Sequence, residues 1–441
     1  MRRHQLAVIG AGYVGLTVAA CFAHLGHRVR CIECDLDKAR ALAQGWVPVA
    51  EPGLEGLWRR HLADGSLRVC GRPQEGLPGA EVVFLCVGTP AAPGGEADLS
   101  QVWAAANGLA QGMPRGCRAV VAIKSTVPPG TSQALASLLR SLRPDLHLSV
   151  VANPEFLREG QALADFLSPP RIVLGSDDDG AVALLEELYA PLGAPVVRCR
   201  PTSAELAKYA CNAFLAARIS FINEVAEVAE VVGADVAEVV RVMGLDPRIG
   251  PAYLEPGLGW GGSCLPKDLR ALIARARAVG VPVPLLEAVV ATNARQVARL
   301  VARLASLLGG LSGRRVALWG LAFKPGCGDT RDSPAVALGR ALQEAGAEVW
   351  AYDPVASAPD FVLHRDPYRA AEGAEAVVLA TAWPELKALD WGRLRSLVAR
   401  PLLLDARNGL DGEAARAAGF TYIPVGRPLV GQPAPAGVEG V

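Results

Sequence analysis

A glycine-rich segment that ends in a cysteine is the part of this sequence best suited to chemistry. Residues 257–268 read Gly-Leu-Gly-Trp-Gly-Gly-Ser-Cys-Leu-Pro-Lys-Asp, and a predicted helix follows. The glycines let a backbone approach a ligand closely. A thiol beside the ammonium of Lys267 and near a helix N-terminus is in a setting that favours the thiolate, which attacks carbonyl carbon. A lone cysteine is more often a small buried hydrophobe, so Cys264 needs support from the rest of the chain.

The first residues of the chain have the pattern of a dinucleotide site. An apolar strand, Gln5–Ile9, precedes a glycine motif and a helix, and a second strand ends at Glu33. The motif consists of Gly10, Ala11, Gly12, Tyr13, Val14 and Gly15. Its glycines permit a tight turn and bring a pyrophosphate to the helix N-terminus, while a carboxylate about 20 residues further on suits a ribose hydroxyl. Glu33 would repel a 2′-phosphate, so we expect NAD rather than NADP.

Three further apolar runs end in polar turns. Residues 82–87 lead to Thr89, residues 119–123 lead to Thr126, and residues 148–152 lead to Glu155 and Glu159. In an open parallel sheet, such turns line the ligand crevice at the carboxyl ends of the strands. These four side chains are therefore candidates for the site.

The middle of the chain predicts one long helix, and the C-terminal part predicts a second strand–helix–strand unit. At 1.5 Å per residue, residues 202–232 would span about 45 Å, enough to bridge two domains. Lys208 and Asn212 share one face of this helix among apolar neighbours, so the pair is either solvated or has a polar partner, which we expect to be a substrate. From Gly313 the strand–helix–strand pattern begins again. Lys324 and Arg331 lie in the turn after its first strand, and their positive charges suit the binding of an anion.

Composition narrows the function classes. Lys plus Arg and Asp plus Glu both number 44, so no basic field attracts nucleic acid or an anionic membrane. Ten cysteines without a disulfide framework favour a reducing compartment, and we expect the cytoplasm. The uncharged stretch after Arg3 could be a targeting segment, but its glycine spacing favours strand, turn and helix. No metal site is expected, because the Cys31-x-x-Cys34 pair lies in a predicted strand and has no second pair.

Together these segments resemble the nucleotide-sugar 6-dehydrogenases. The resemblance runs from Gly10 to about Asn408, and rests also on residues 88–90, 125–131, 153–160, 248–250 and 323–331. It implies oxidation of a primary alcohol to a carboxylate with two NAD and a water, through a thiohemiacetal and a thioester on Cys264. UDP-glucose is the expected substrate; UDP-N-acetylmannosamine and GDP-mannose are alternatives, and a nucleotide-sugar-binding protein without turnover is a more distant one.

The resemblance also implies a role for each matching residue. Catalysis is expected from Cys264, Lys208, Asn212, Asp268, Glu155, Glu159 and Thr126, and the choice of general base stays open. Cofactor binding is expected from Gly10 to Gly15 and from Glu33, Lys38, Thr89, Thr126, Glu159, Lys267 and Arg331. Substrate binding is expected from Glu155, Phe156, Leu157, Arg158, Glu159, Lys208, Asn212, Arg248, Tyr253, Leu254, Glu255, Pro256, Gly257, Gly261 and Lys324. Arg248 would come from a second subunit, which implies a homodimer built on the long helix, or a higher homo-oligomer.

The expected fold is therefore α/β, with two doubly wound Rossmann-like domains joined by the long helix and a helical linker domain. The predicted bounds are 1–200 for NAD binding, 201–308 for the central domain with the cysteine loop, and 309–441 for nucleotide-sugar binding.

Overall fold

The computed structural model describes residues 2–428, and the chain divides into two compact units. The first comprises the residues up to Cys211 together with Arg270–Gly280, and the second comprises Asn212–Leu269 and the residues from Val281 onward. The C-terminal end of the predicted third domain, residues 429–441, lies outside the described residues. Each unit is described by itself.

The first unit is built on an eight-stranded sheet of order β3-β2-β1-β4-β5-β6-β7-β8, parallel except where β6 meets β7. Its strands are β1 Gln5–Ile9, β2 Arg28–Ile32, β3 Leu67–Cys70, β4 Val82–Leu85, β5 Arg118–Ile123, β6 His147–Ala152, β7 Ile172–Gly175 and β8 Val196–Cys199. Its helices are α1 Tyr13–His24, α2 Leu36–Ala43, α3 Leu54–Ala63, α4 Pro73–Gly76, α5 Ser100–Gly112, α6 Thr131–Leu142, α7 Ala162–Leu167 and α8 Asp179–Tyr189, with a 3₁₀ turn at Ala190–Leu192.

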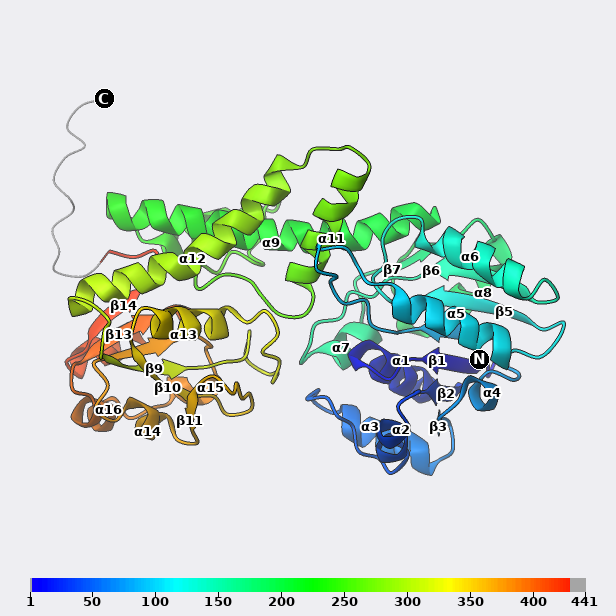
Figure 1. Ribbon diagram of the computed structural model, residues 1–441, viewed down its shortest axis with the longest axis horizontal. Coiled ribbons are helices and arrows are strands. Elements are labelled where there is room, and N and C mark those ends of the chain that lie inside the picture. The colour runs from blue at the N-terminus through cyan, green and yellow to red at the C-terminus, as the bar shows by residue number, and fades with distance from the viewer. Residues whose placement is uncertain (1, 429–441) are drawn as a thin grey trace. The chain divides into compact units, whose positions relative to one another are not determined.

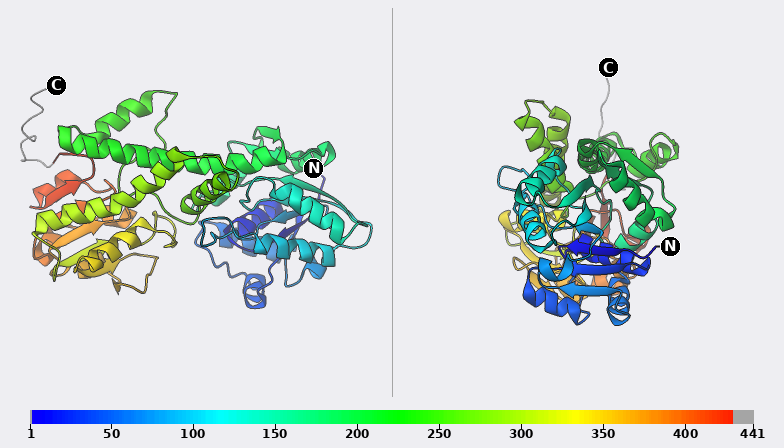
Figure 2. Two further views of the ribbon diagram at one scale, coloured as in Figure 1. Left: turned by 45° about the horizontal axis from the view of Figure 1, so that its top comes forward. Right: turned by 90° about the vertical axis from the view of Figure 1, so that its right-hand side faces the viewer.

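Both faces of this sheet are covered by helices, so its strands are apolar on both sides. Along β1, Leu6 and Val8 pack in one core layer with α1, whereas Ala7 and Ile9 pack in the other with α5 and α6. Helices α5 and α6 lie side by side (Figures 1 and 2). Continuous apolar strands between two helical layers are typical of parallel sheets. The predicted doubly wound architecture is confirmed for this unit.

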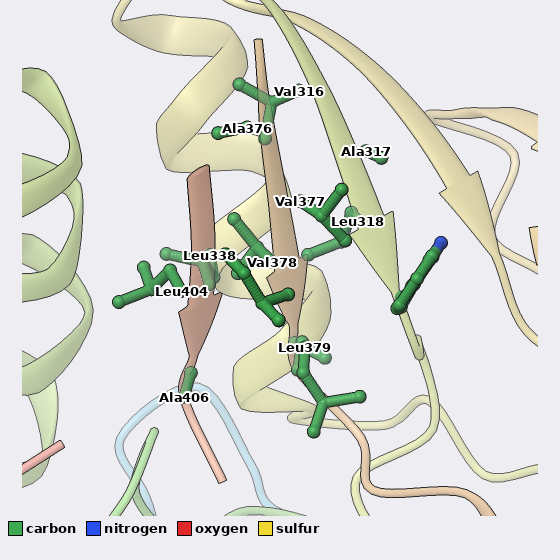
Figure 3. Close-up of a cluster of buried hydrophobic side chains, with 14 of the residues drawn as sticks. Val316, Ala317, Leu318, Leu338, Ala376, Val377, Val378, Leu379, Leu404 and Ala406 are labelled. Atoms are coloured by element: carbon green, nitrogen blue, oxygen red, sulfur yellow. The ribbon is translucent and has the colours of Figure 1, made fainter. Parts of the chain in front are cut away.

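The second unit contains a six-stranded parallel sheet of order β11-β10-β9-β12-β13-β14. Its strands are β9 Arg315–Trp319, β10 Glu348–Tyr352, β11 Val362–His364, β12 Ala376–Leu379, β13 Leu402–Asp405 and β14 Thr421–Pro424. Its helices are α13 Pro334–Glu344, α14 Pro367–Ala371, α15 Pro384–Lys387, α16 Trp391–Leu397 and α17 Gly412–Ala417. Figure 3 shows part of its core, where Leu318, Val378 and Leu404 from three strands cluster with Leu338 of α13.

Four helices lie between the two sheets in the sequence. Helix α9, Pro201–Val232, is the predicted long helix; it begins in the first unit and continues in the second. It is followed by α10 Val236–Leu245, α11 Leu265–Ala278 and α12 Pro284–Leu308. None of the helices within residues 2–428 combines the length and apolar character that a membrane span requires.

Candidate active site

The glycine motif forms an open cradle at the start of α1. Gly10 has a φ of 95°, and a Cβ there would lie 2.8 Å from the carbonyl oxygen of Cys86. A Cβ at Gly15 would lie 1.8 Å from the carbonyl oxygen of Gly10, so neither position tolerates a side chain. Among the residues that the structure describes, in contrast, a Cβ at Gly12 would meet nothing within 4 Å, and no side chain caps the helix there. This open helix N-terminus fits a pyrophosphate.

Glu33 lies where the ribose carboxylate is expected, at the end of β2. Its side chain is only 7% exposed, and Lys38 Nζ lies 2.7 Å from Oε2. Burial alone would raise the pKa of Glu33, but the hydrogen bonds from Lys38 and from the Asp35 amide outweigh burial and hold the pKa below its usual value. Gly12, Lys38 and the exposed Trp46 line an adjoining cavity of about 540 Å³. An ionised carboxylate beside an open helix N-terminus fits NAD.

Hydrogen bonds join the polar turns of this unit at one edge of the sheet. Thr89 Oγ1 donates to the carbonyl oxygen of Thr126 at 2.8 Å. The Tyr13 hydroxyl donates to Glu51 and accepts from the amide of Gly160 at 2.6 Å, which ties the glycine motif to the 153–160 turn. The expectation that these turns converge at the carboxyl ends of the strands is therefore met within this unit.

Lys208 and Glu155 form a buried ion pair. The ammonium nitrogen lies 3.2 Å from Glu155 Oε1, while Oε2 accepts the Leu157 amide at 2.5 Å. Lys208 also lies 5.3 Å from the centre of the Phe156 ring. Both charged side chains are buried, so Lys208 is not a solvated surface lysine. In the same turn Glu159 is half-buried, and Arg158 forms an ion pair with Asp165 at 2.6 Å.

Lys124, a second buried lysine beside this turn, was not among the predicted site residues. Its ammonium nitrogen lies 3.3 Å from the Tyr189 hydroxyl, which donates to Asn153 Oδ1 at 2.7 Å. Lys124 and Glu155 line the same small cavity. Burial lowers the pKa of Lys124 to about 8, a shift that the Glu155 carboxylate opposes and the Lys208 ammonium reinforces.

Replacing Lys124 with Met should change how stability depends on pH. The folded-state pKa is about 8 and the usual value is 10.5, so the unfolded chain binds more protons between these pH values. Wild-type stability should therefore rise relative to Lys124→Met across this window, by up to about 3 kcal/mol. Denaturant unfolding from about pH 7 to 10.5 measures this difference. The exposed Lys387→Met serves as the charge-matched control, and a difference that does not vary with pH would contradict the expectation.

In the second unit, Cys264 lies at the head of α11. Its carbonyl oxygen accepts the Asp268 amide at 2.9 Å, which is the first hydrogen bond of the helix, and its exposed sulfur lies 3.6 Å from Ser263 Oγ. The positive end of the helix dipole stabilises negative charge at this position. The structure thus gives the thiol the helix-terminal setting that the sequence predicted.

Asp268, one helical turn after Cys264, holds two of the other predicted residues. Asn212 Nδ2 donates to Asp268 Oδ2 at 2.6 Å, and Lys267 Nζ lies 2.5 Å from Oδ1. The carboxylate is 1% exposed, so its charge is balanced by the Lys267 ammonium in a buried setting. Asn212 and Lys267 therefore hold this carboxylate from two sides.

Polar side chains that were not predicted from the sequence form hydrogen bonds with the loop before Cys264. The Gly257 amide donates to Asn223 at 2.8 Å, and Gln296 donates to the Gly257 carbonyl at 2.6 Å. Asn293 exchanges two hydrogen bonds of 2.9 Å with the backbone of Trp260. A Cβ at Gly261 would lie 2.2 Å from the Asp332 carbonyl oxygen, so glycine is required there. Asn223, Asn293 and Gln296 lie on helices that carry many other polar residues, so the sequence offered no distinct signal for them.

The other predicted residues of the second unit lie in the 248–256 and 323–331 segments. Arg331 forms an ion pair with Asp329 at 2.7 Å, and Lys324 lies 5.5 Å from the centre of the Phe323 ring. The Arg248 side chain is 87% exposed. Tyr253 has a φ of 61°, Glu255 is exposed, and Leu254 and Pro256 are buried.

The fold and these residues define a class: a dinucleotide-dependent dehydrogenase with a thiol at a helix terminus. Models of the UDP-glucose/GDP-mannose dehydrogenase family match three parts of the chain: the NAD binding domain at residues 4–193, the central domain at 202–295 and the UDP binding domain at 317–412. The chain belongs to this family.

Similar proteins extend over nearly the whole chain. UDP-glucose 6-dehydrogenase of Pseudomonas aeruginosa is 44% identical over 97% of this chain and 98% of its own length. UDP-glucose 6-dehydrogenase TuaD of Bacillus subtilis is 41% identical over 97% of this chain and 94% of its own. The structure of a UDP-glucose dehydrogenase from Pyrobaculum islandicum superposes with a TM-score of 0.89 at 39% identity, covering 97% of this chain and 98% of that one.

Proposed function

We propose that this protein oxidises UDP-glucose to UDP-glucuronate with two NAD and one water. The observation that carries the proposal is the thiol of Cys264 at the head of α11, one turn before a buried Asp268 held by Asn212 and Lys267. Relatives more than 40% identical over nearly their whole length carry the name UDP-glucose 6-dehydrogenase, which favours glucose as the sugar.

The chain's own residues hold the substrate carbon between the two oxidations. NAD, when bound, supplies the hydride acceptor for both. An aldehyde has no alkoxide to drive out a second hydride, so the Cys264 thiolate adds to its carbon and forms a thiohemiacetal. Oxidation of that adduct gives a thioester; water then breaks the carbon–sulfur bond, which releases the carboxylate and returns the thiolate.

We assign hydrogen-bond donors and carboxylates of this chain to the individual steps. The Lys208 ammonium and the Asn212 amide are proposed to stabilise the oxygen that becomes negative. An amide nitrogen has two hydrogens, and Asp268 accepts one from Asn212, so the other is available to the substrate. Glu155, Glu159 and Thr126 are proposed to surround the water.

A substrate panel tests the reaction. Purified protein is given NAD with UDP-glucose, UDP-N-acetylmannosamine or GDP-mannose, and NADH and the sugar acid are both quantified. We expect the highest kcat/KM with UDP-glucose and about two NADH per sugar, because each of the two hydride transfers reduces one NAD. Faster turnover of another sugar would contradict the substrate, and binding without NADH would identify a non-catalytic binding protein.

We further propose that the protein is a homodimer formed along α9. Phe214, Phe221 and Val228 recur every seven residues on this helix, and all three side chains are more than half exposed. Apolar residues at a seven-residue spacing form the stripe through which helices pair. The exposed Arg248 is then available to the second copy.

Mass measurement in solution tests the dimer. Light scattering is expected to give twice the chain mass of 46.0 kDa for the wild type. Phe221→Glu should give a single-chain mass, because it places a charge in the apolar stripe. Val355→Glu changes another exposed apolar residue outside α9 and should leave the mass unchanged. A wild type of single-chain mass would contradict the proposal.

A further inference from the structure

Strands β2 and β3 of the first unit's sheet carry three arginines towards their amino ends, all on one face. In β2, Arg28 and Arg30 alternate with the buried Val29. The strand register pairs Arg30 with Arg68 of β3 and Arg28 with Gln5 of β1. Because side chains alternate along a strand and paired residues share a face, all three arginines lie on the same side of the sheet.

This face changes character along the strands. Towards the carboxyl ends, Ile9, Ile32 and Cys70 are buried in the core layer that contains α5 and α6. Towards the amino ends, the arginines and Arg3 line a cavity of about 290 Å³. Gly76 and Ala80, at the end of α4 and shortly after it, also line the cavity. We call this space the arginine cavity.

The arginine cavity has an excess of positive charge. Like charges directly opposite one another on neighbouring strands are destabilising, and Arg30 and Arg68 are such a pair. Within residues 2–428, none of its four guanidinium groups forms an ion pair with a carboxylate; Arg30 instead donates to the Pro78 carbonyl at 2.5 Å. Asp64 is the acidic residue in the described lining, and its carboxylate accepts the Ser66 amide at 2.8 Å.

We propose that the arginine cavity binds a small phosphate-bearing anion. Guanidinium groups match phosphate oxygens with paired hydrogen bonds, and several arginines around one space concentrate that capacity. The volume lies at the lower end of the range for ligand pockets, which fits a pyrophosphate or a phosphorylated small molecule better than a dinucleotide. The anion would remove the repulsion between Arg30 and Arg68.

This site is separate from the cofactor residues of the same unit. Gly12 and Glu33 follow the carboxyl ends of β1 and β2, whereas Arg3 and Arg28 stand at the amino ends of those strands. Parallel strands place these two sets at opposite edges of the sheet. NAD and the anion should therefore bind at the same time.

Calorimetric titration with pyrophosphate tests the proposal. The protein is first saturated with NAD, so that the helix N-terminus at Gly12 does not compete for the probe. We expect saturable binding of one pyrophosphate per chain to the wild type. The triple variant Arg28→Gln, Arg30→Gln, Arg68→Gln should bind it at least about tenfold more weakly. The matched control Arg60→Gln, Arg115→Gln, Arg118→Gln removes three other exposed arginines of this unit and should bind it as the wild type does.

Several results would overturn the proposal. The wild type could show no saturable binding of pyrophosphate. The control triple variant could lose as much pyrophosphate affinity as the cavity triple variant, or the cavity triple variant could keep the wild-type affinity. Citrate is a tricarboxylate of similar charge. If it binds as tightly as pyrophosphate, the assignment of the ligand as a phosphate-bearing anion is wrong. NAD affinity reports whether each variant is folded. If the cavity triple fails that check, Arg68→Gln alone replaces it, and the same weakened pyrophosphate binding is expected.

Discussion

Cys264→Ala should abolish formation of the sugar acid while leaving NAD binding intact. The variant lacks the sulfur that converts the aldehyde into an oxidisable adduct, so the second oxidation has no substrate. Removing an enzyme's nucleophile lowers turnover by several orders of magnitude, and we expect a loss of kcat on the order of 10⁴-fold or more. NAD affinity should not change, because the residues expected to bind the cofactor, among them Gly12 and Glu33, do not include Cys264.

Acid production measured by mass spectrometry and NADH measured by absorbance check this expectation together. Cys117→Ala is the matched control, since Cys117 is a half-buried cysteine of the first unit outside the candidate site. Wild-type enzyme quenched during turnover should carry the sugar on the peptide that contains Cys264. Full activity in Cys264→Ala, or an adduct on another residue, would be incompatible with the covalent step.

Most of the fold is predictable from local sequence because buried parallel strands and glycine turns leave strong signals. The first strand, the glycine motif and the strand that ends at Glu33 form a continuous pattern, and the structure has them at the expected residues. Strands β3, β7, β8 and β11 escaped prediction. Each is only three or four residues long, so none has the extended apolar run that identifies a strand in the sequence.

The partners of the charged side chains were harder to predict, since they depend on contacts between distant segments. Glu155 and Lys208 were each expected in the site, but their ion pair joins residues 53 positions apart. Lys267 was expected to face the cofactor, and the structure directs its ammonium to the neighbouring Asp268. Adjacent residues on a helix do not normally face each other, so no spacing rule predicts this pair.

The same reason explains the supporting residues that were missed. Asn223 and Gln296 reach Gly257 from positions 34 and 39 residues away. Each resembles a solvated polar residue on an amphipathic helix until tertiary structure supplies its acceptor or donor. Local sequence thus predicts which residue types are unusual, and the fold determines which of them meet.

Lys208→Met should lower kcat by about 10²–10³-fold, the usual cost of removing one donor to a developing oxyanion. The change should also destabilise the first unit, because it leaves the buried Glu155 carboxylate without the cation 3.2 Å away. Removing one partner of a buried ion pair costs about 3–5 kcal/mol. The single variant alone therefore does not separate a role in turnover from a role in folding.

The double variant Lys208→Met, Glu155→Gln separates the two roles. It removes both charges, so unfolding by denaturant should show that much of the lost stability returns. Turnover should stay at or below that of the single variant, because no ammonium has been restored to stabilise the negative oxygen. Recovery of kcat together with stability would mean that Lys208 acts only by holding Glu155. A change confined to KM in the single variant would instead make Lys208 a ground-state binding residue.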